Sequence, residues 1–131
     1  MRIFKTKEFN HFTDREAITD QTLKKTALQI DAGLIDADLG GGVIKQRVPR
    51  PGQGKSGGYR AIVCFRKERC LFFVHGFAKS RQSNISATEL IDLRDLAKIL
   101  LNLTDEQLAD ELAAGAVMEI LEGPNGKKIQ K

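Results

Sequence analysis

Three strand-like segments constrain the fold more than any other feature of this chain. The segments Val43–Val48, Tyr59–Arg66 and Cys70–Phe77 are rich in β-branched and aromatic residues, as strands are. A short polar turn at residues 67–69 joins the last two segments, which predicts an antiparallel hairpin. Residues 49–58 hold two prolines and four glycines, and this composition predicts a loop that stays outside the sheet.

Basic side chains are concentrated around these strands. Residues 44–81 contain ten basic residues and one acidic residue, whereas residues 82–122 contain nine acidic and two basic ones. Side chains alternate along a strand, so Lys45 and Arg47 share one side of theirs. We therefore expect a sheet with one apolar face and one cationic face, which suits a polyanion such as RNA, and an anionic helical back. Plainly solvated charged faces are the alternative interpretation.

The rest of the chain predicts helices on either side of the strands. Helical spacing of apolar residues and capping motifs mark the helices, and a chain of 131 residues suits one domain with its own core. We predict an α+β fold with a small antiparallel sheet, N-terminal helices packed on one face, and C-terminal helices. The other expected elements are an edge strand at Met1–Lys5, a short helix at Thr6–Phe12, a helix at Asp20–Ala32 stopped by Gly33, a turn at Ala37–Gly42, a helix opened by Ser86 with Glu89, and a helix opened by Thr104 with Gln107 that continues to Glu122.

Several classes of protein are disfavoured by composition. No apolar run is long enough to span a membrane, and the N-terminus lacks a signal-peptide core, so we expect a cytoplasmic protein. Cys64 and Cys70 match no zinc-ligand spacing and are expected to be reduced thiols. No paired carboxylates and no metal-binding cluster stand out, so we expect neither a metal nor a cofactor.

The glycine-rich loop resembles a nucleotide-binding loop only at its end. Gly54, Lys55 and Ser56 fit the last positions of a Walker motif, but Pro49 stands where the first glycine is required. The loop also lies between two predicted strands, whereas a Walker loop opens a helix. The loop at residues 49–58, with four glycines and two cations, instead suits a rim for phosphate contacts. The alternative is a flexible connection that happens to be basic.

The histidines do not indicate a catalytic centre. His75 lies in an apolar strand with Phe73 and Phe77 expected on its own face, and a satisfied, half-buried structural role is favoured over a catalytic one. His11 is expected at the surface. The chemistry therefore has to come from cations, which can cleave RNA by orienting its 2′-OH and stabilising charge on the phosphate. Arginine suits bidentate phosphate contact, and a lysine crowded by other cations suits the role of base.

The same motifs carry a family resemblance. The run DADLGGGVIKQRVPRPGQGKSGGYRAIVCFR, followed by FFVHGFAKSRQSNIS and then EL, is similar to the RelE/HigB-like toxins of type II toxin–antitoxin systems. The similarity extends over about Phe4 to Leu103. It implies a microbial-RNase-like fold across a single domain, residues 1–131, with a core at about 4–103, a C-terminal helix at 104–122 and a frayed tail at 123–131.

The resemblance also implies an activity and its partners. It implies a ribosome-dependent endoribonuclease that cuts mRNA in the ribosomal A site without a metal. The 2′-OH would attack, leaving a 2′,3′-cyclic phosphate and a 5′-OH. The implied partners are mRNA, the ribosome and a cognate antitoxin, which in this subgroup often carries a helix-turn-helix domain.

The family roles can be carried over to matching positions of this sequence. Arg60 corresponds to the arginine that stabilises the transition-state phosphate, and Lys45 with Arg47 corresponds to the basic pair that orients RNA or the 2′-OH. Lys55 is a phosphate contact or a base, and Lys79 stabilises the phosphate or the leaving oxygen. The expected catalytic residues are Lys45, Lys55, Arg60 and Lys79, and the expected RNA-binding residues are Arg47, Arg50, Tyr59, Arg81 and Asn84.

One departure concerns proton transfer. Some RelE members carry a catalytic tyrosine shortly after the last cations, where this chain has Asn84, and Tyr59 is the only tyrosine. Either another group takes the proton-transfer role, as in HigB-like relatives that lack the tyrosine, or activity is weak. Two other functions stay open: a non-catalytic nucleic-acid-binding or regulatory module, and a ParE-like toxin that binds a protein target such as gyrase.

Overall fold

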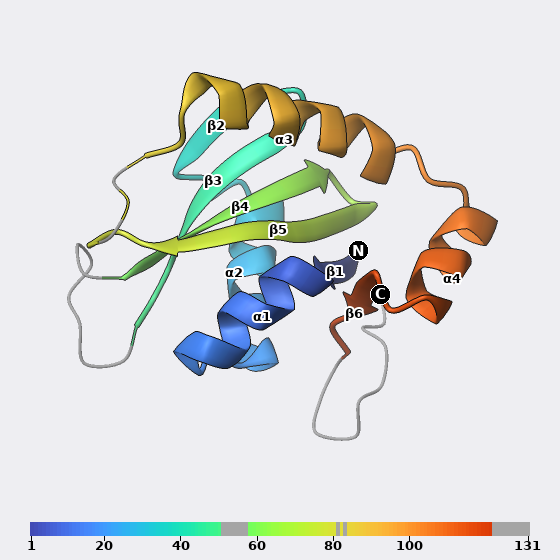
Figure 1. Ribbon diagram of the computed structural model, residues 1–131, viewed down its shortest axis with the longest axis horizontal. Coiled ribbons are helices and arrows are strands. Elements are labelled where there is room, and N and C mark those ends of the chain that lie inside the picture. Colours follow the sequence, from blue (N-terminus) through green and yellow to red (C-terminus); the bar gives the residue numbers. More distant parts are fainter. Residues whose placement is uncertain (51–57, 81, 83, 122–131) are drawn as a thin grey trace.

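The sheet is the centre of the fold, and helices lie on both of its faces (Figure 1). The computed structural model describes residues 1–50, 58–80, 82 and 84–121. Its elements, in chain order, are β1 (Arg2–Thr6), α1 (Lys7–Glu16), α2 (Asp20–Asp31), β2 (Ala37–Gly40), β3 (Val43–Val48), β4 (Tyr59–Arg66), β5 (Cys70–Ala78), α3 (Ala87–Leu100), α4 (Asp105–Ala113) and β6 (Val117–Glu119).

The six strands of the described chain form one sheet in the order β2-β3-β4-β5-β1-β6. β1 pairs with β5 in parallel, and the remaining pairs are antiparallel. The predicted α+β class, with N-terminal helices on one face of a largely antiparallel sheet, is confirmed. Within the described residues, no helix combines the length and the apolar character needed to cross a membrane.

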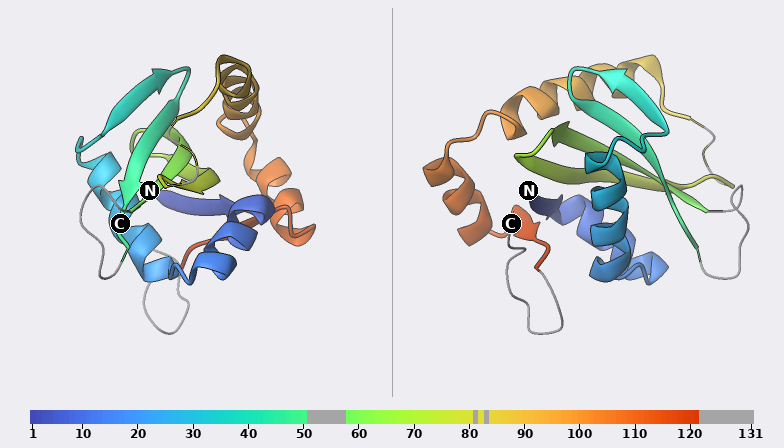
Figure 2. Two further views of the ribbon diagram at one scale, coloured as in Figure 1. Left: turned by 60° about the vertical axis from the view of Figure 1, so that its left-hand side comes forward. Right: turned by 180° about the vertical axis from the view of Figure 1, so that it is seen from behind.

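Helices lie over both faces of the sheet (Figure 2), and an apolar cluster packs against each face. On one face, α1 and α2 bring Phe9 and Leu23 against the strands, and on the other, α3 and α4 bring Ala97 and Leu108. The prediction of one apolar and one cationic face is therefore wrong as a description of the whole sheet. The reason is that β4 is apolar at successive positions, so its side chains are buried on both sides.

The central strands agree with the sequence. β3 and β4 have the predicted bounds, and β4 and β5 form the predicted antiparallel hairpin. The expected turn at Ala37–Gly42 is partly wrong, because Ala37–Gly40 is strand β2, paired with β3. Gly41 and Gly42 form the turn after Gly40, the last residue of β2, and the φ angles of the three glycines, 85°, 64° and 85°, are values that other residues rarely adopt.

The N-terminal helices begin where their capping residues predict. The hydroxyl of Thr6 accepts a hydrogen bond from the amide of Phe9, and Thr19 caps α2 in the same way. The second helix ends at Asp31 and is followed by Gly33 at φ 91°, as expected, whereas α1 continues past Phe12 to Glu16.

The two ends of the chain depart furthest from the prediction. β1 is not an edge strand, because β6 pairs with it on the side away from β5. The last predicted helix stops at Ala113, since Gly115 at φ 76° turns the chain into β6. The amide of Ile120 then donates to the carbonyl of Ile3 at 2.8 Å. The expected tail at 123–131 lies outside the described residues.

Candidate functional site

Three of the predicted cations lie on one face of the sheet. Val43 and Ile62 belong to the cluster under α3, so alternation places Lys45, Arg47 and Arg60 on that same face. In the β3–β4 register Lys45 lies opposite Ile62, and Arg47 lies opposite Arg60. The predicted sharing of a face by Lys45 and Arg47 is therefore confirmed, and Arg60 joins them from the neighbouring strand.

Lys79 extends this group across a third strand. Phe77 lies in the α3-side cluster and opposite Arg60, and Lys79 follows it by two residues, directly after β5 ends at Ala78. The amide of Lys79 faces the carbonyl of Gly58 at 3.4 Å. We refer to Lys45, Arg47, Arg60 and Lys79 as the cationic site.

The cationic site lacks carboxylate partners. The ion pairs of the described residues include Arg2 with Glu119 and Lys5 with Asp20, but none involves a side chain of the cationic site. The one carboxylate contact found in the described part of the chain is to the backbone, where the Arg47 amide donates to Asp36 at 2.6 Å. Within the described part of the chain, the Arg60 guanidinium donates to the backbone carbonyl of Tyr59 at 3.2 Å. Like charges facing each other across two strands disfavour the folded state, and an anionic ligand would relieve this.

Asn84 lies beside the cationic site, just before α3 begins. Its side-chain Oδ1 accepts a hydrogen bond from Lys45 Nζ at 3.4 Å and from the Ile85 amide at 2.9 Å. Its backbone carbonyl accepts from the Gln82 side chain at 2.8 Å. The segment after β5 thus holds an amide against Lys45.

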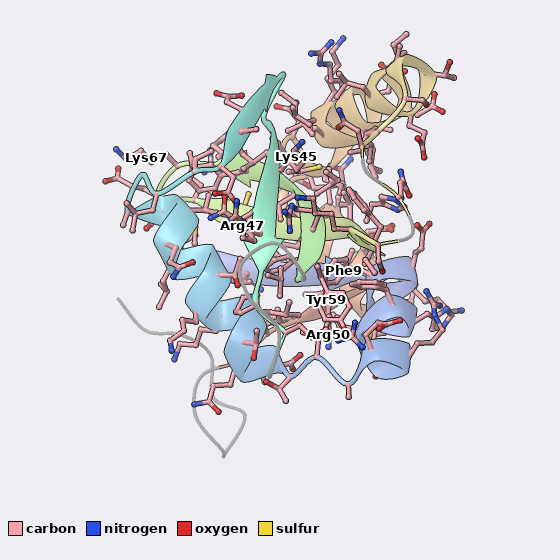
Figure 3. The ribbon with its side chains drawn as sticks, turned by 90° about the vertical axis from the view of Figure 1, so that its left-hand side faces the viewer. Phe9, Lys45, Arg47, Arg50, Tyr59 and Lys67 are labelled. Atoms are coloured by element: carbon pink, nitrogen blue, oxygen red, sulfur yellow. The ribbon has the colours of Figure 1, made fainter. Side chains whose placement is uncertain are left out.

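Arg50 and Tyr59 lie on the opposite face of the sheet. Tyr59 is 3% exposed, and its hydroxyl donates to Glu16 at 2.9 Å, while the Arg50 guanidinium lies 5.4 Å from the Tyr59 ring centroid. Figure 3 shows both residues toward α1, away from Lys45. The structure therefore does not bring them to the cationic site. Tyr59 and Arg60 are neighbours in β4, so their side chains point to different faces of the sheet. This alternation is the feature of the sequence that predicts their separation. Lys55 and Arg81 lie outside the described residues.

Tyr59 and Arg50 instead line a pocket of about 370 Å³ between the start of α2 and the end of β3. Arg15, Glu16 and Thr19 form its other walls. The Tyr59 hydroxyl donates a hydrogen bond to Glu16 at the end of α1. Tyr59 therefore has a structural role at this pocket, where it joins β4 to α1.

His75 lies at an irregularity that the sequence did not predict. A register shift between Ile62 and Val63 breaks the alternation of β5, so Phe73 faces α1 whereas Phe77 faces α3. The prediction that both phenylalanines share the face of His75 is therefore wrong. The side chain of His75 is 28% exposed, with Nδ1 3.5 Å from the Glu8 carboxylate. Its Nε2 is buried and makes no hydrogen bond within the described part of the chain, so the histidine is only partly satisfied.

The thiols of Cys64 and Cys70 are poor candidates for a nucleophile, because burial favours their protonated form. Burial raises the pKa of Cys64 from 9.0 to about 12, and the negative charge of Cys70 adds to this. Burial also raises the pKa of Cys70, against the lowering effect of nearby arginines. Both cysteines are free, as expected. The described residues also contain no group of three or more His, Cys, Asp or Glu side chains able to hold a metal ion.

Residues 1–120 match the sequence model of one protein family, described as the RelE toxin of the RelE / RelB toxin–antitoxin system. The chain belongs to the RelE toxin family. No match was found among curated proteins. The predicted relationship to RelE-like toxins is thus confirmed, and the α+β fold of this RelE-family toxin agrees with it. Membership implies a cognate antitoxin as partner, and the family is generally associated with the cleavage of mRNA.

Proposed function

We propose that this RelE-family toxin is a ribosome-dependent mRNA endoribonuclease centred on the cationic site. The observation that carries the proposal is the facing pair of Arg47 and Arg60, flanked by Lys45 and Lys79, whose side chains form no ion pair with a carboxylate among the described residues. A surface of this kind is suited to the RNA backbone, since phosphates supply the missing negative charge. Membership of the RelE toxin family supports the same reading.

The proposed reaction uses the nucleophile of the RNA itself. The 2′-oxygen forms a bond to phosphorus, the bond from phosphorus to the 5′-oxygen breaks, and the products are a 2′,3′-cyclic phosphate and a 5′-hydroxyl. In the transition state between these two species, negative charge builds up on the non-bridging phosphate oxygens. Arg60, whose planar guanidinium can donate two parallel hydrogen bonds, stabilises that charge, and Arg47 holds the adjoining backbone.

Proton transfer is assigned to the two lysines. Lys45 accepts the proton from the 2′-OH, and Lys79 donates a proton to the leaving 5′-oxygen. The Asn84 amide supports this assignment, because it contacts Lys45 Nζ at 3.4 Å and limits where the amine can lie. Lys55 and Arg81 are proposed as further phosphate contacts on sequence grounds, whereas Arg50 and Tyr59 are left out of the site.

The proposed partners follow from this activity. The substrate is mRNA in the A site of a translating ribosome in the cytoplasm, and a cognate antitoxin, proposed to be of the helix-turn-helix type, neutralises the toxin. The HigB-like subgroup is proposed from the RPGQGKSGGYR loop and the GFAKSRQSNI segment.

Brief induction in bacteria, followed by mapping of mRNA 5′ ends, tests the proposal. Wild type is compared with Arg60→Ala and with Lys67→Ala, a matched control in the exposed β4–β5 turn that Figure 3 shows far from Lys45. Wild type and control should arrest growth and give new 5′ ends inside translated codons, and Arg60→Ala should give neither. Growth arrest without cleavage would indicate a protein target, and the absence of arrest would indicate a binding module.

A further inference from the structure

The pocket on the α1 side of the sheet holds two arginines that the proposed reaction does not use. Its volume is about 370 Å³, and the described residues that line it include Arg15, Glu16, Thr19, Thr22, Arg50 and Tyr59. We refer to it as the Arg50 pocket. The chain turns at Ala17, whose φ is 56°, so the end of α1 and the start of α2 form two of its walls. A volume of this size suits a small organic group such as one nucleotide.

Arg50 presents a flat cationic group in this pocket. Its guanidinium lies 5.4 Å from the ring centroid of Tyr59, and the tyrosine is buried whereas the arginine is exposed. Figure 3 shows the two residues together between α1 and α2. A guanidinium held over an aromatic ring is planar and partly fixed in orientation, and nucleobases stack on such planes in complexes with single-stranded RNA.

The charge of the Arg50 pocket favours an anionic group. Arg15 and Arg50 are both exposed, and neither side chain forms an ion pair with a carboxylate among the described residues. Glu16 accepts the hydroxyl of Tyr59 at 2.9 Å, which holds this carboxylate against the strand. Asp20, at the start of α2, is paired with a lysine of β1 at 2.7 Å. The two guanidiniums are therefore available to a ligand that combines a flat ring with a phosphate.

The Arg50 pocket and the cationic site lie at the same end of the sheet. Arg47 pairs with Arg60, and the next pair toward the ends of the two strands is Val48 with Tyr59. Side chains of adjacent pairs lie on opposite faces, so the ends of β3 and β4 separate the pocket from the cationic site. An RNA chain bound at the cationic site therefore reaches the pocket by passing this end of the sheet.

We propose that the Arg50 pocket binds one nucleotide of the substrate RNA, beside the segment that is cleaved. The base stacks on the Arg50 guanidinium, and Arg15 binds the adjoining phosphate. This inference deepens the proposed function, on which it rests for the identity of the substrate. A peptide carboxylate fits less well, because it would pair with the arginines but would leave the stacking surface unused.

The single tyrosine of the chain allows occupancy of the pocket to be measured directly. The chain has one tyrosine and no tryptophan, so fluorescence excited beyond the absorption of phenylalanine comes from Tyr59 in the pocket wall. The probes are a 2′-O-methyl single-stranded RNA oligonucleotide, which cannot be cleaved, an abasic oligonucleotide with the same phosphates, and uridine monophosphate. The RNA oligonucleotide should quench Tyr59 and, in filter binding, should bind about tenfold more tightly than the abasic one.

A double variant tests the two arginines. Arg15→Ala with Arg50→Ala should bind the RNA oligonucleotide about tenfold more weakly, and saturating RNA should no longer quench Tyr59. Lys67→Ala with Arg69→Ala is the matched control, because it removes the same two charges from the exposed β4–β5 turn, and it should bind and quench like wild type. Circular dichroism and thermal melting show that each variant folds.

Several results would overturn the proposal. These are affinity of the double variant within about twofold of wild type, equal affinity for the abasic and the base-carrying oligonucleotide, and quenching by uridine monophosphate as tight as that by RNA. Arg60→Ala should cut no mRNA and yet show the quenching at saturating RNA. Quenching by RNA in a wild-type toxin that cuts no mRNA would count against the nuclease activity alone, and cleavage without quenching would count against the pocket alone.

Discussion

Arg47 on β3 lies opposite Arg60 on β4 in the antiparallel register, and neither side chain forms an ion pair with a carboxylate among the described residues. A facing pair of like charges opposes folding by up to about 1 kcal/mol. Such a pair persists where a function needs the charge. We therefore expect the two arginines, which the strand register brings together, to bind a phosphate backbone.

Removal of one of these cations should not destabilise the fold. Arg60→Ala relieves the repulsion from Arg47 and breaks one hydrogen bond to a neighbouring carbonyl, so its free energy of unfolding should stay equal to wild type or rise by up to ~1 kcal/mol. Urea titration followed by circular dichroism measures this. A loss of several kcal/mol would mean that Arg60 has a structural role, and Lys67→Ala serves as the control.

Lysine 45 should not tolerate replacement by arginine. Lys45→Arg keeps the positive charge and hence the affinity for RNA, but an arginine does not give up its proton, so cleavage should fall sharply. Filter binding of RNA and cleavage assays on the same preparation separate the two effects. Equal cleavage by wild type and variant would favour a binding module that needs charge alone.

Tyrosine 59 should matter for stability and not for cleavage. Tyr59→Phe removes the buried hydrogen bond to Glu16 at 2.9 Å, and we expect a loss of about 1 kcal/mol in the free energy of unfolding. Cleavage at a temperature well below the melting point should be unchanged. A folded Tyr59→Phe variant with wild-type stability and little cleavage would return Tyr59 to the site.

The buried thiol of Cys64 should make stability depend on pH. Its pKa is raised from 9.0 to about 12, so the unfolded chain gives up this proton at a lower pH than the folded chain does. Stability should therefore be level below about pH 9 and fall as the pH rises from 9 toward 12.

Denaturant titrations of wild type and Cys64→Ala between pH 8 and pH 11 measure this effect, and the variant should show a shallower fall. Equal dependence of stability on pH in wild type and Cys64→Ala would contradict this role of the buried thiol. At pH 8 a thiol reagent should label Cys64 only after unfolding, because the side chain is both buried and protonated.

The central hairpin and the face of its cations follow from local rules. Strand alternation alone assigns Lys45 and Arg47 to one side of β3, and the same rule applied to β4 separates Tyr59 from Arg60. Capping residues likewise locate the starts of helices, as the Thr6 hydroxyl shows. Strand alternation and helix capping are set by residues that are close in the sequence, so they can be predicted without knowledge of the fold.

The features that were missed depend on contacts between distant segments. The apolar spacing of the β6 residues also fits a helix. These residues form a strand because they pair with β1, which is far away in the sequence. The register shift at His75 similarly arises from how β5 meets β4, and it changes which side chains share its face. The sheet order, with β1 parallel to β5, brings the two ends of the chain together through long-range pairing.

Cleavage of mRNA on programmed ribosomes by the purified toxin tests the central claim most directly. The rates of wild type, Arg60→Ala and the control Lys67→Ala are compared, and the cut ends are analysed chemically. Wild type and control should cut within the A-site codon and leave a 2′,3′-cyclic phosphate. Loss of ~2–4 kcal/mol of transition-state stabilisation should slow Arg60→Ala by about 30- to 1,000-fold. Cleavage by Arg60→Ala at the wild-type rate would contradict a nuclease centred on the cationic site.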